Sequence, residues 1–400
     1  MKRFIGNITQ NEDCLVLNVW TPNGNEKSDV LKPVMFWIHG GGLKIGSSFQ
    51  WVYNGSALAA HDVVVVSVNY RVDVFGFIYG GNESSAQGNM GLFDQLLALK
   101  WVRENIHLFG GDKEKVTIFG ESAGSMFVST HLISPLSKGL FKRAIMESGG
   151  HFYNKLRQPL NTTEAMQLSV ELAKQFNCTT SQWLDYVDII AGIARHEGSG
   201  FLYGGGLVPH NISKKDFMVL VDYFDKTSHN LNASEITEFY LANKTSSHDI
   251  EWAVYDLYGD LIMTCPTYLF AKNYAQHTDA DNNNVYFYEI TYQRLTTAIG
   301  FIKEMDVTHT AELDFVFGLP VLKPEISDTE VDVKFSKLLM KLWTDFAKYG
   351  KPSTVWPKLV DTRDPKYVPE IYDLNPNTDK HIFNNLFSKT CDGFWKNYYN

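Results

Sequence analysis

The chain has 400 residues, of which 44% are apolar, so it can bury a large core. Its formal net charge of −9 and its isoelectric point of about 5.7, without any block of basic residues, argue against a nucleic-acid-binding surface. The longest apolar run, Val63–Val68, is far shorter than a bilayer span, so we expect no transmembrane segment.

Two features of the sequence bear on its cellular compartment. We expect no signal peptide at Met1–Phe4, because these residues are followed by polar residues and not by an apolar segment. Asn-x-Ser/Thr acceptor motifs nevertheless recur along the chain and favour a glycoprotein of the secretory pathway, either extracellular or in the ER lumen. These motifs begin at Asn7, Asn54, Asn82, Asn161, Asn177, Asn211, Asn232 and Asn243.

The first half alternates short β-branched runs with longer helical patterns. Apolar residues at helical spacing predict helices over Gly91–Ile106 and Ala123–Ile133. The alternation, with glycine-rich turns at strand ends, predicts an α/β fold with a mostly parallel sheet covered by helices on both faces. The expected strands are Cys14–Trp20, Val34–Ile38, Val63–Val68, Val116–Phe119 and Arg143–Met146.

The second half is more helical. We expect helices over Thr163–Phe176 and Val331–Tyr349 and one strand over Val285–Ile290. No repeat, low-complexity tract or linker interrupts the pattern, so residues 1–400 are interpreted as one domain.

The most informative segment is Gly-Glu-Ser-Ala-Gly at residues 120–124, which follows an expected strand and precedes an expected helix. A nucleophile on such a turn adopts a strained backbone conformation, and only small neighbours leave room for it. The motif predicts that Ser122 is a catalytic nucleophile. Taken alone, it is equally consistent with a glycine-rich turn that carries a solvated serine.

A second motif favours the enzymatic interpretation. The expected strand Val34–Ile38 runs into His-Gly-Gly-Gly at residues 39–42, the type of loop whose N–H groups form an oxyanion hole in esterases and lipases. Both motifs follow strands, and chemistry on a parallel sheet belongs at the carboxyl ends of its strands.

Several blocks resemble the type-B carboxylesterases, the cholinesterase-like branch of the α/β-hydrolases. Residues 12–22 are similar to that family's second signature, and Phe119–Gly124 is similar to its nucleophile signature. Further family-like blocks lie at residues 69–72, 88–95, 109–112 and 147–149. The resemblance covers nearly the whole chain. It implies an α/β-hydrolase fold and hydrolysis of a small-molecule carboxylic ester through an acyl-enzyme, without a metal or cofactor.

The resemblance also implies a catalytic triad in the order Ser, acid, His. The acid is normally a Glu followed by Gly, which indicates Glu197, after an apolar run at 189–193 that we expect to be a strand. His309 is indicated by the family-like segment 312–318 that follows it. In this chemistry a neutral imidazole accepts the serine proton, and the carboxylate holds its tautomer. The alternative for Glu197 is a surface glutamate in a turn.

Further roles are implied by the resemblance. The N–H groups of Gly41, Gly42 and Ala123 are expected to form the oxyanion hole, where the loss of one donor typically costs about 3 kcal/mol. Glu121 and Glu312 match acidic positions of the family's gorge, and the Ser148 hydroxyl matches one that supports the acid. The alternative for these last three residues is an ordinary polar environment. Of the four cysteines, Cys265 and Cys391 match a family disulfide, and Cys14 and Cys178 are expected to be unpaired.

The chain also departs from the family. Several tens of residues that normally precede Glu12 are missing, and the stretch from Cys178 to Glu197 is too short to carry the usual acyl pocket, so we expect an incomplete domain. Phe4 stands where cholinesterases hold a Trp that faces choline, and Gly200 replaces an aromatic residue. We therefore expect a generic carboxylic ester as the substrate, with weak discrimination among acyl lengths.

A function from another class remains open. The chain could be a non-catalytic, cholinesterase-like binding or adhesion ectodomain, or an inactive fragment. The intact motif around Ser122 favours the enzyme, whereas the missing segments favour the alternative. The oligomeric state is left open.

Overall fold

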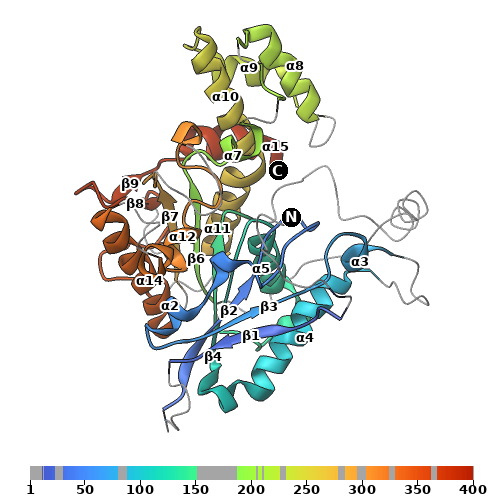
Figure 1. The fold of residues 1–400 in the computed structure, drawn as a ribbon. Helices are drawn as coiled ribbons and strands as arrows, with labels where there is room; N and C mark the ends of the chain where they lie inside the picture. The colour runs from blue at the N-terminus through green and yellow to red at the C-terminus, as the bar shows by residue number, and fades with distance from the viewer. Residues whose placement is uncertain are drawn as a thin grey trace.

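The computed structural model describes residues 11, 13–22, 30–79, 88–150, 187–203, 206–209, 211–225, 231–277, 284–294, 303–323, 329–361 and 367–399. In these ranges the strands form one nine-stranded sheet in the order β1-β3-β2-β4-β5-β6-β7-β8-β9 (Figure 1). The strands are β1 (Leu17–Trp20), β2 (Lys32–Ile38), β3 (Val64–Val68), β4 (Gly111–Glu121), β5 (Arg143–Glu147), β6 (Asp188–Ala194), β7 (Val285–Ile290), β8 (Glu370–Leu374) and β9 (Ile382–Asn384).

The sheet is parallel from β3 to β8, and only the edge strands β1 and β9 run antiparallel to their neighbours. This confirms the predicted mostly parallel sheet. The strand expected over Cys14–Trp20 begins only at Leu17, and β4 extends beyond the expected Val116–Phe119 at both ends. The strands β8 and β9 were not predicted.

Helices cover both faces of the sheet. Those expected in the first half are α4 and α5, and that expected at Val331–Tyr349 is α14. The helix expected at Thr163–Phe176 lies outside the described residues. The α-helices are α2 (Ser56–Ala59), α3 (Asp73–Phe77), α4 (Met90–Asn105), α5 (Ala123–Ile133), α7 (Ser199–Leu202), α8 (Lys214–Asp225), α9 (Ala233–Leu241), α10 (Ser247–Gly259), α11 (Cys265–His277), α12 (Leu313–Val316), α13 (Leu319–Leu322), α14 (Glu330–Tyr349) and α15 (Lys396–Tyr399).

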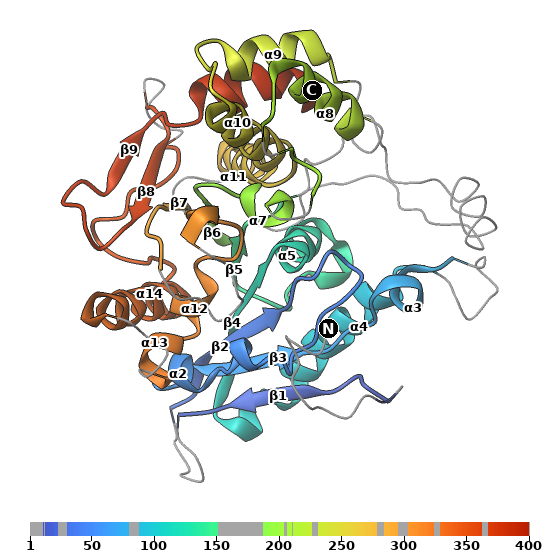
Figure 2. The same cartoon turned by 45° about the horizontal axis from the view of Figure 1, so that its top comes forward.

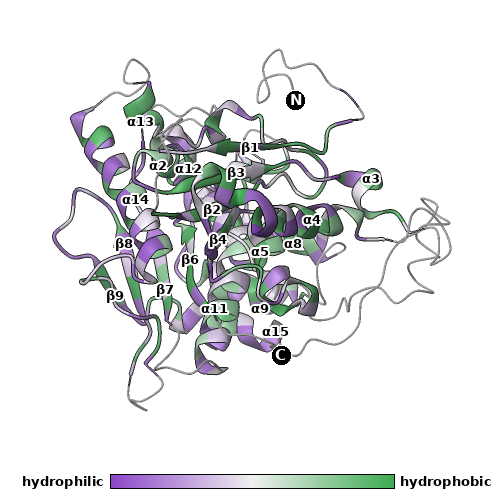
Figure 3. Ribbon diagram, turned by 90° about the horizontal axis from the view of Figure 1, so that it is seen from below, coloured by the Kyte–Doolittle hydropathy of each residue, from purple (hydrophilic) through white to green (hydrophobic). Residues whose placement is uncertain are grey.

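Two apolar cores lie against the two faces because successive side chains of a strand point in opposite directions. In β2, Phe36 belongs to the core shared with α4, α5 and α11, whereas Trp37 belongs to the core shared with α14. Figure 2 shows α5 and α14 on opposite sides of the sheet. Figure 3 shows mostly apolar central strands, whereas α14 mixes polar and apolar residues, as expected of a helix with one buried face.

The helices α8, α9 and α10 stand together at one end of the molecule (Figure 1). A π-helical turn, Asp260–Thr264, joins α10 to α11, and the predicted disulfide Cys265–Cys391 ties α11 to the C-terminal segment. Cys14 is unpaired and exposed, as expected, and Cys178 lies outside the described residues. Among the described helices, none combines the length and apolar composition that crossing a bilayer requires.

Candidate active site

The predicted nucleophile lies on a sharp turn between β4 and α5. Ser122 has φ 55° and ψ −122°, a region that non-glycine residues rarely adopt. Its N–H donates to the carbonyl oxygen of Glu147, at the end of β5, over 2.9 Å. The turn is therefore held in a strained conformation at the carboxyl edge of the central strands, as the motif predicts.

Close backbone contacts explain the glycines around this serine. A Cβ atom on Gly124 would lie 2.1 Å from the carbonyl oxygen of Ile38, and one on Gly120 would lie 2.6 Å from the same atom. A Cβ atom on Gly149 would lie 2.4 Å from the carbonyl oxygen of Ser122. The ends of β2 and β5 thus pack so closely against the turn that no side chain fits between them.

The His-Gly-Gly-Gly loop reaches the same turn. A Cβ atom on Gly40 would lie 3.1 Å from the Cβ atom of Ser122. Gly41 and Gly42 have φ of +118° and +62°, so the loop needs residues without a side chain. The N–H groups of Gly41, Gly42 and Ala123 make no hydrogen bond within the described part of the chain. The loop and the start of α5 therefore place unpaired donors beside the serine.

His39 supports this loop as a neutral residue. It is 1% exposed, and its ring stacks on the ring of Tyr70 with 4.3 Å between centroids. The Tyr70 hydroxyl donates to the His39 carbonyl oxygen. Burial lowers the pKa of His39 to about 4, which keeps its imidazole uncharged near neutral pH. Its role is thus to hold the loop in shape.

The predicted acid and base meet across 112 residues of sequence. Glu197 follows β6 and is 1% exposed, which rules out the alternative of a surface glutamate. Its Oε1 accepts hydrogen bonds from the Ser148 hydroxyl (2.6 Å) and the Ala194 N–H (2.7 Å). Its Oε2 lies 2.6 Å from Nδ1 of His309. The structure therefore brings Glu197, Ser148 and His309 together.

The other ring nitrogen of His309 faces Glu121, the residue that precedes the serine. Nε2 lies 2.8 Å from Oε1 of Glu121, at ion-pair distance but without the alignment of a hydrogen bond. Within the described part of the chain the Ser122 hydroxyl makes no hydrogen bond. Burial by itself would lower the pKa of His309, but the carboxylates of Glu121 and Glu197 outweigh it and raise the pKa well above 6.5.

Two further buried carboxyl groups complete the site. Glu312 accepts a hydrogen bond from the Tyr288 hydroxyl (3.0 Å), and Glu147 accepts one from Nε1 of Trp343 (2.7 Å). Burial, then the charges of Glu197 and Glu121, raises the pKa of Glu312 to about 8. Burial, then the charge of Glu312, raises the pKa of Glu147 well above its ordinary value. Glu147 was assigned no role from the sequence, although it belongs to the family-like block 147–149.

Comparison with known proteins agrees with this architecture. The sequence model of the carboxylesterase family matches residues 1–186 and 180–391. Mus musculus cholinesterase is 33% identical over 98% of this chain and 73% of its own length. Acetylcholinesterase of Danio rerio is 32% identical over 94% of this chain and 71% of its own. Acetylcholinesterase-1 of Trittame loki is 32% identical over 97% of this chain and 80% of its own.

The alignments also bear on the short stretch before Glu197. The match to the mouse protein extends over 459 residues, more than the 400 of this chain, so the relative contains segments without a counterpart here. The two pieces of the family match meet at residues 180–186, within the stretch that the sequence analysis found short. With a match to both halves, and with these relatives, the chain belongs to the carboxylesterase family of α/β-hydrolases.

Proposed function

We propose that this protein hydrolyses carboxylic esters through an acyl-enzyme on Ser122, with His309 as general base, Glu197 as its carboxylate partner and Gly41, Gly42 and Ala123 as oxyanion donors. Family membership supports ester hydrolysis in general. The observation that carries the finer proposal is the meeting of Glu197 and His309, at 2.6 Å, at the same sheet edge as the strained Ser122.

The proposed reaction proceeds in two halves. Ser122 Oγ attacks the ester carbonyl carbon while Nε2 of His309 accepts its proton, and the developing oxyanion receives hydrogen bonds from the loop N–H groups. The intermediate collapses, and the imidazolium returns the proton to the leaving alcohol. A water molecule then attacks the acyl-enzyme with the same base, which releases the acid and restores the serine. Glu197 keeps the proton on Nδ1 throughout.

With Glu121 at Nε2 and Glu197 at Nδ1, a carboxylate lies on each side of the His309 imidazole. The Glu121 carboxylate, close to Nε2, stabilises the imidazolium that forms during each half-reaction. The same contact competes with the Ser122 hydroxyl for Nε2 in the free protein. We therefore propose that the ring turns from Glu121 toward Ser122 when substrate binds, since catalytic hydrogen bonds often tighten only in the complex.

The substrate is proposed to be a generic carboxylic ester. Gly200 contributes no aromatic ring beside the acid loop, and among the described aromatic side chains only Phe201 packs on the His309 ring, with 4.8 Å between centroids. Phe4 lies outside the described residues. We expect low activity on short p-nitrophenyl esters, with nearly equal rates from acetyl to hexanoyl. An enzyme distinguishes acyl chains of different length only where a pocket contacts the added methylene groups.

The test is covalent labelling of the full chain with a fluorophosphonate, followed by mass mapping of the adduct. We expect the label on Ser122, and loss of both label and ester hydrolysis in Ser122→Ala. Ser129→Ala is the matched control, because that hydroxyl only donates to the Met126 carbonyl oxygen within α5. An adduct on another serine would refute the assignment. A folded protein without label or hydrolysis would favour the non-catalytic binding ectodomain.

We further propose that the protein belongs to the secretory pathway and carries N-linked glycans. The described acceptor asparagines, Asn54, Asn211, Asn232 and Asn243, are all exposed. The Cys265–Cys391 disulfide is typical of oxidising compartments. The mobility of protein from a secretory host should therefore increase after treatment with an N-glycosidase, and an unchanged mobility would reject the glycan proposal.

A further inference from the structure

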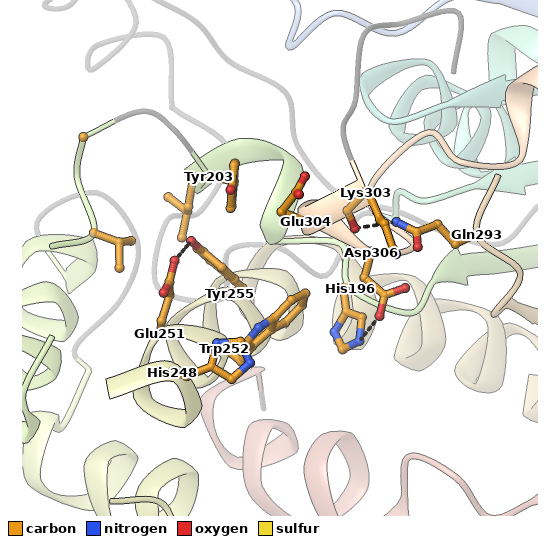
Figure 4. A pocket seen from close by; sticks show the side chains of 13 residues that line it. His196, Tyr203, His248, Glu251, Trp252, Tyr255, Gln293, Lys303, Glu304 and Asp306 are labelled. Carbon is orange, nitrogen blue, oxygen red and sulfur yellow. Dashed lines mark hydrogen bonds and ion pairs between the residues drawn. The ribbon is translucent and has the colours of Figure 1, made fainter. Parts of the chain in front are cut away.

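A cavity of about 880 Å³ beside α10 and a second one of about 420 Å³ beside β1 are not lined by the proposed catalytic residues. The larger cavity carries net negative charge, because Glu251, Glu304 and Asp306 line it against the single ammonium group of Lys303 (Figure 4). Among the described residues that line the second cavity there is no carboxylate, and Lys323 is the one cationic residue. The second cavity therefore favours an uncharged ligand.

The second cavity has aromatic walls. Trp20 ends β1, Trp51 begins the 3-10 turn Trp51–Tyr53, and Phe49 precedes that turn. Trp20 and Trp51 are half-buried, and Phe49 is 38% exposed. Leu322, in α13, adds exposed aliphatic surface. Covering such apolar surface is favourable because it is removed from water, so the walls offer stabilisation to a ligand with an apolar face.

One face of the Trp51 ring is open to a ligand. The ammonium nitrogen of Lys323 lies 4.7 Å from the centroid of this ring, and Lys323 is exposed. An exposed cation–π contact is weak, and a lysine side chain is flexible. A ligand can therefore replace Lys323 over the ring while the ammonium group donates to the ligand from the rim of the cavity.

The polar side chains of the cavity are neutral amides and a hydroxyl. Nδ2 of Asn18 donates to the Ser48 hydroxyl over 3.3 Å, and Oε1 of Gln50 accepts from the Ser47 N–H over 3.4 Å. Oδ1 of Asn18 and Nε2 of Gln50 make no hydrogen bond within the described part of the chain. One acceptor and one donor thus remain for a ligand. Rings beside neutral amides suit a sugar, whose C–H face packs on rings while its polar groups form hydrogen bonds.

The chain itself carries an attachment point for such a sugar at this cavity. Asn54, the first residue of the acceptor motif Asn54-Gly55-Ser56, is exposed and lines the cavity. Its Oδ1 accepts a hydrogen bond from the Ser56 N–H over 2.9 Å, and its Nδ2 makes no hydrogen bond within the described residues. A Cβ atom on Gly55 would lie 2.8 Å from Cε3 of Trp20. The Trp20 ring therefore packs directly against the motif.

We propose that Asn54 carries an N-linked glycan whose first N-acetylglucosamine residues lie in this cavity, packed on Trp20 and Trp51. In this modification, Nδ2 of Asn54 bonds to C1 of the sugar, the bond between C1 and the diphosphate of a lipid-linked donor breaks, and Nδ2 gives up one proton. The inference rests on the glycans proposed above, and it adds which residue is modified and what the sugar contacts. The glycan is thus a structural part of the protein and stabilises the fold beside β1.

The experiment combines peptide mass mapping with thermal unfolding of the full chain from a secretory host. We expect a glycan on Asn54 in the wild type and none in Ser56→Ala, which lacks the motif's hydroxyl. Ser56→Thr keeps the motif and is the matched control. The Ser56 hydroxyl makes no hydrogen bond within the described part of the chain, so its loss alone removes no contact. The Tm of Ser56→Ala should be lower by about 2 °C or more, whereas Ser56→Thr should match the wild type.

The contrary outcomes separate this inference from the proposals on which it rests. An unmodified Asn54 in protein that carries glycans elsewhere would overturn it and leave the general glycan proposal intact, whereas a chain without any glycan would reject both. Equal Tm values for Ser56→Ala and Ser56→Thr would show that the sugar does not pack on the protein. Neither measurement depends on ester hydrolysis.

A double-mutant cycle tests whether the sugar lies on Trp51. Trp51→Leu should lower the Tm more in the glycosylated chain than in the Ser56→Ala background, because only the glycosylated chain loses a contact with the sugar. Trp252→Leu, at the larger cavity, is the control and should lower the Tm equally in both backgrounds. Equal losses for Trp51→Leu in the two backgrounds would place the glycan outside the cavity and reject the inference.

Discussion

Around Ser122 the candidate site depends on glycines, which leave room for close backbone packing, whereas around His309 it depends on buried charged groups. On the serine side, hypothetical Cβ atoms on Gly124 and Gly41 would both lie 2.1 Å from a backbone oxygen. On the histidine side, Glu121 and Glu197 are at most 3% exposed and both approach the imidazole. Substitutions on the serine side should therefore lower activity through steric conflict, and substitutions on the histidine side should lower it by changing the charge around the imidazole.

Two buried histidines show the same difference. His39 is surrounded by backbone and the Tyr70 ring, and burial lowers its pKa to about 4. His309 is also buried, but the charges of Glu121 and Glu197 raise its pKa well above 6.5. Burial alone thus produces a neutral structural imidazole, and paired carboxylates convert the same side chain into one that holds a proton.

The largest effect is expected for His309→Ala. Without the imidazole, no group accepts the Ser122 proton, and kcat should fall by about 10⁴-fold or more, as when either member of a catalytic Ser-His pair is removed. The measurement is p-nitrophenyl acetate hydrolysis with a purified, folded variant. His107→Ala, on the surface after α4, is the control and should retain wild-type kcat. A His309→Ala enzyme within tenfold of wild type would contradict the assigned base.

A steric effect of intermediate size is expected for Gly41→Ala. The new Cβ would lie 2.1 Å from the Ile45 carbonyl oxygen at φ +118°, so the loop must rearrange and its N–H donors shift. Loss of one oxyanion donor typically lowers kcat by about 10²–10³-fold. Gly42→Ala is the matched comparison, since at φ +62° its Cβ meets no atom within 4 Å. Equal losses in both variants would show that close packing at Gly41 is not the cause.

A smaller, charge-based effect is expected for Glu121→Gln. His309 must be neutral to act as a base, and the neighbouring carboxylates raise its pKa. In the wild type, the fall of kcat/KM toward low pH (the acid limb of its pH profile) should therefore lie above pH 6.5. Removing the Glu121 charge lowers the pKa of His309 and moves this limb to lower pH. Glu114→Gln, exposed on the same strand, should leave the limb in place. An unmoved limb in Glu121→Gln would mean that this carboxylate does not control the base.

The smallest effect on activity is expected for Cys265→Ser with Cys391→Ser, although the effect on stability is large. The disulfide closes a loop across 126 residues, and a loop of this length contributes about 4–5 kcal/mol in the chain-entropy model. We expect a lower Tm with unchanged kcat in the folded protein at 25 °C, because a disulfide acts mainly by constraining the unfolded chain. Cys14→Ser, at the exposed free thiol, should change neither. A Tm equal to that of the wild type would show that the bond adds nothing to stability.

The sequence by itself determined the local parts of this protein. The strands β2 to β7 follow from short apolar runs, and the turn at Ser122 follows from the glycines at the end of β4, because these patterns act through neighbouring backbone atoms. The last two strands, β8 and β9, were missed, since they are short and depend on pairing with distant residues. Glu197, His309 and the disulfide pair were indicated only through resemblance to a family, as spacing alone does not relate residues so far apart.

Only the tertiary structure decided the electrostatics and the second cavity. That Nε2 of His309 faces Glu121, and that Glu147 and Glu312 lie buried nearby, depends on where β4, β5 and the segment after His309 come together. The second cavity, beside β1, likewise combines Trp20, Trp51 and Leu322 from separate stretches of chain. A pattern of neighbours in sequence specifies backbone conformation, whereas the pKa values and ligand preference of a site depend on charges and rings that only folding brings together.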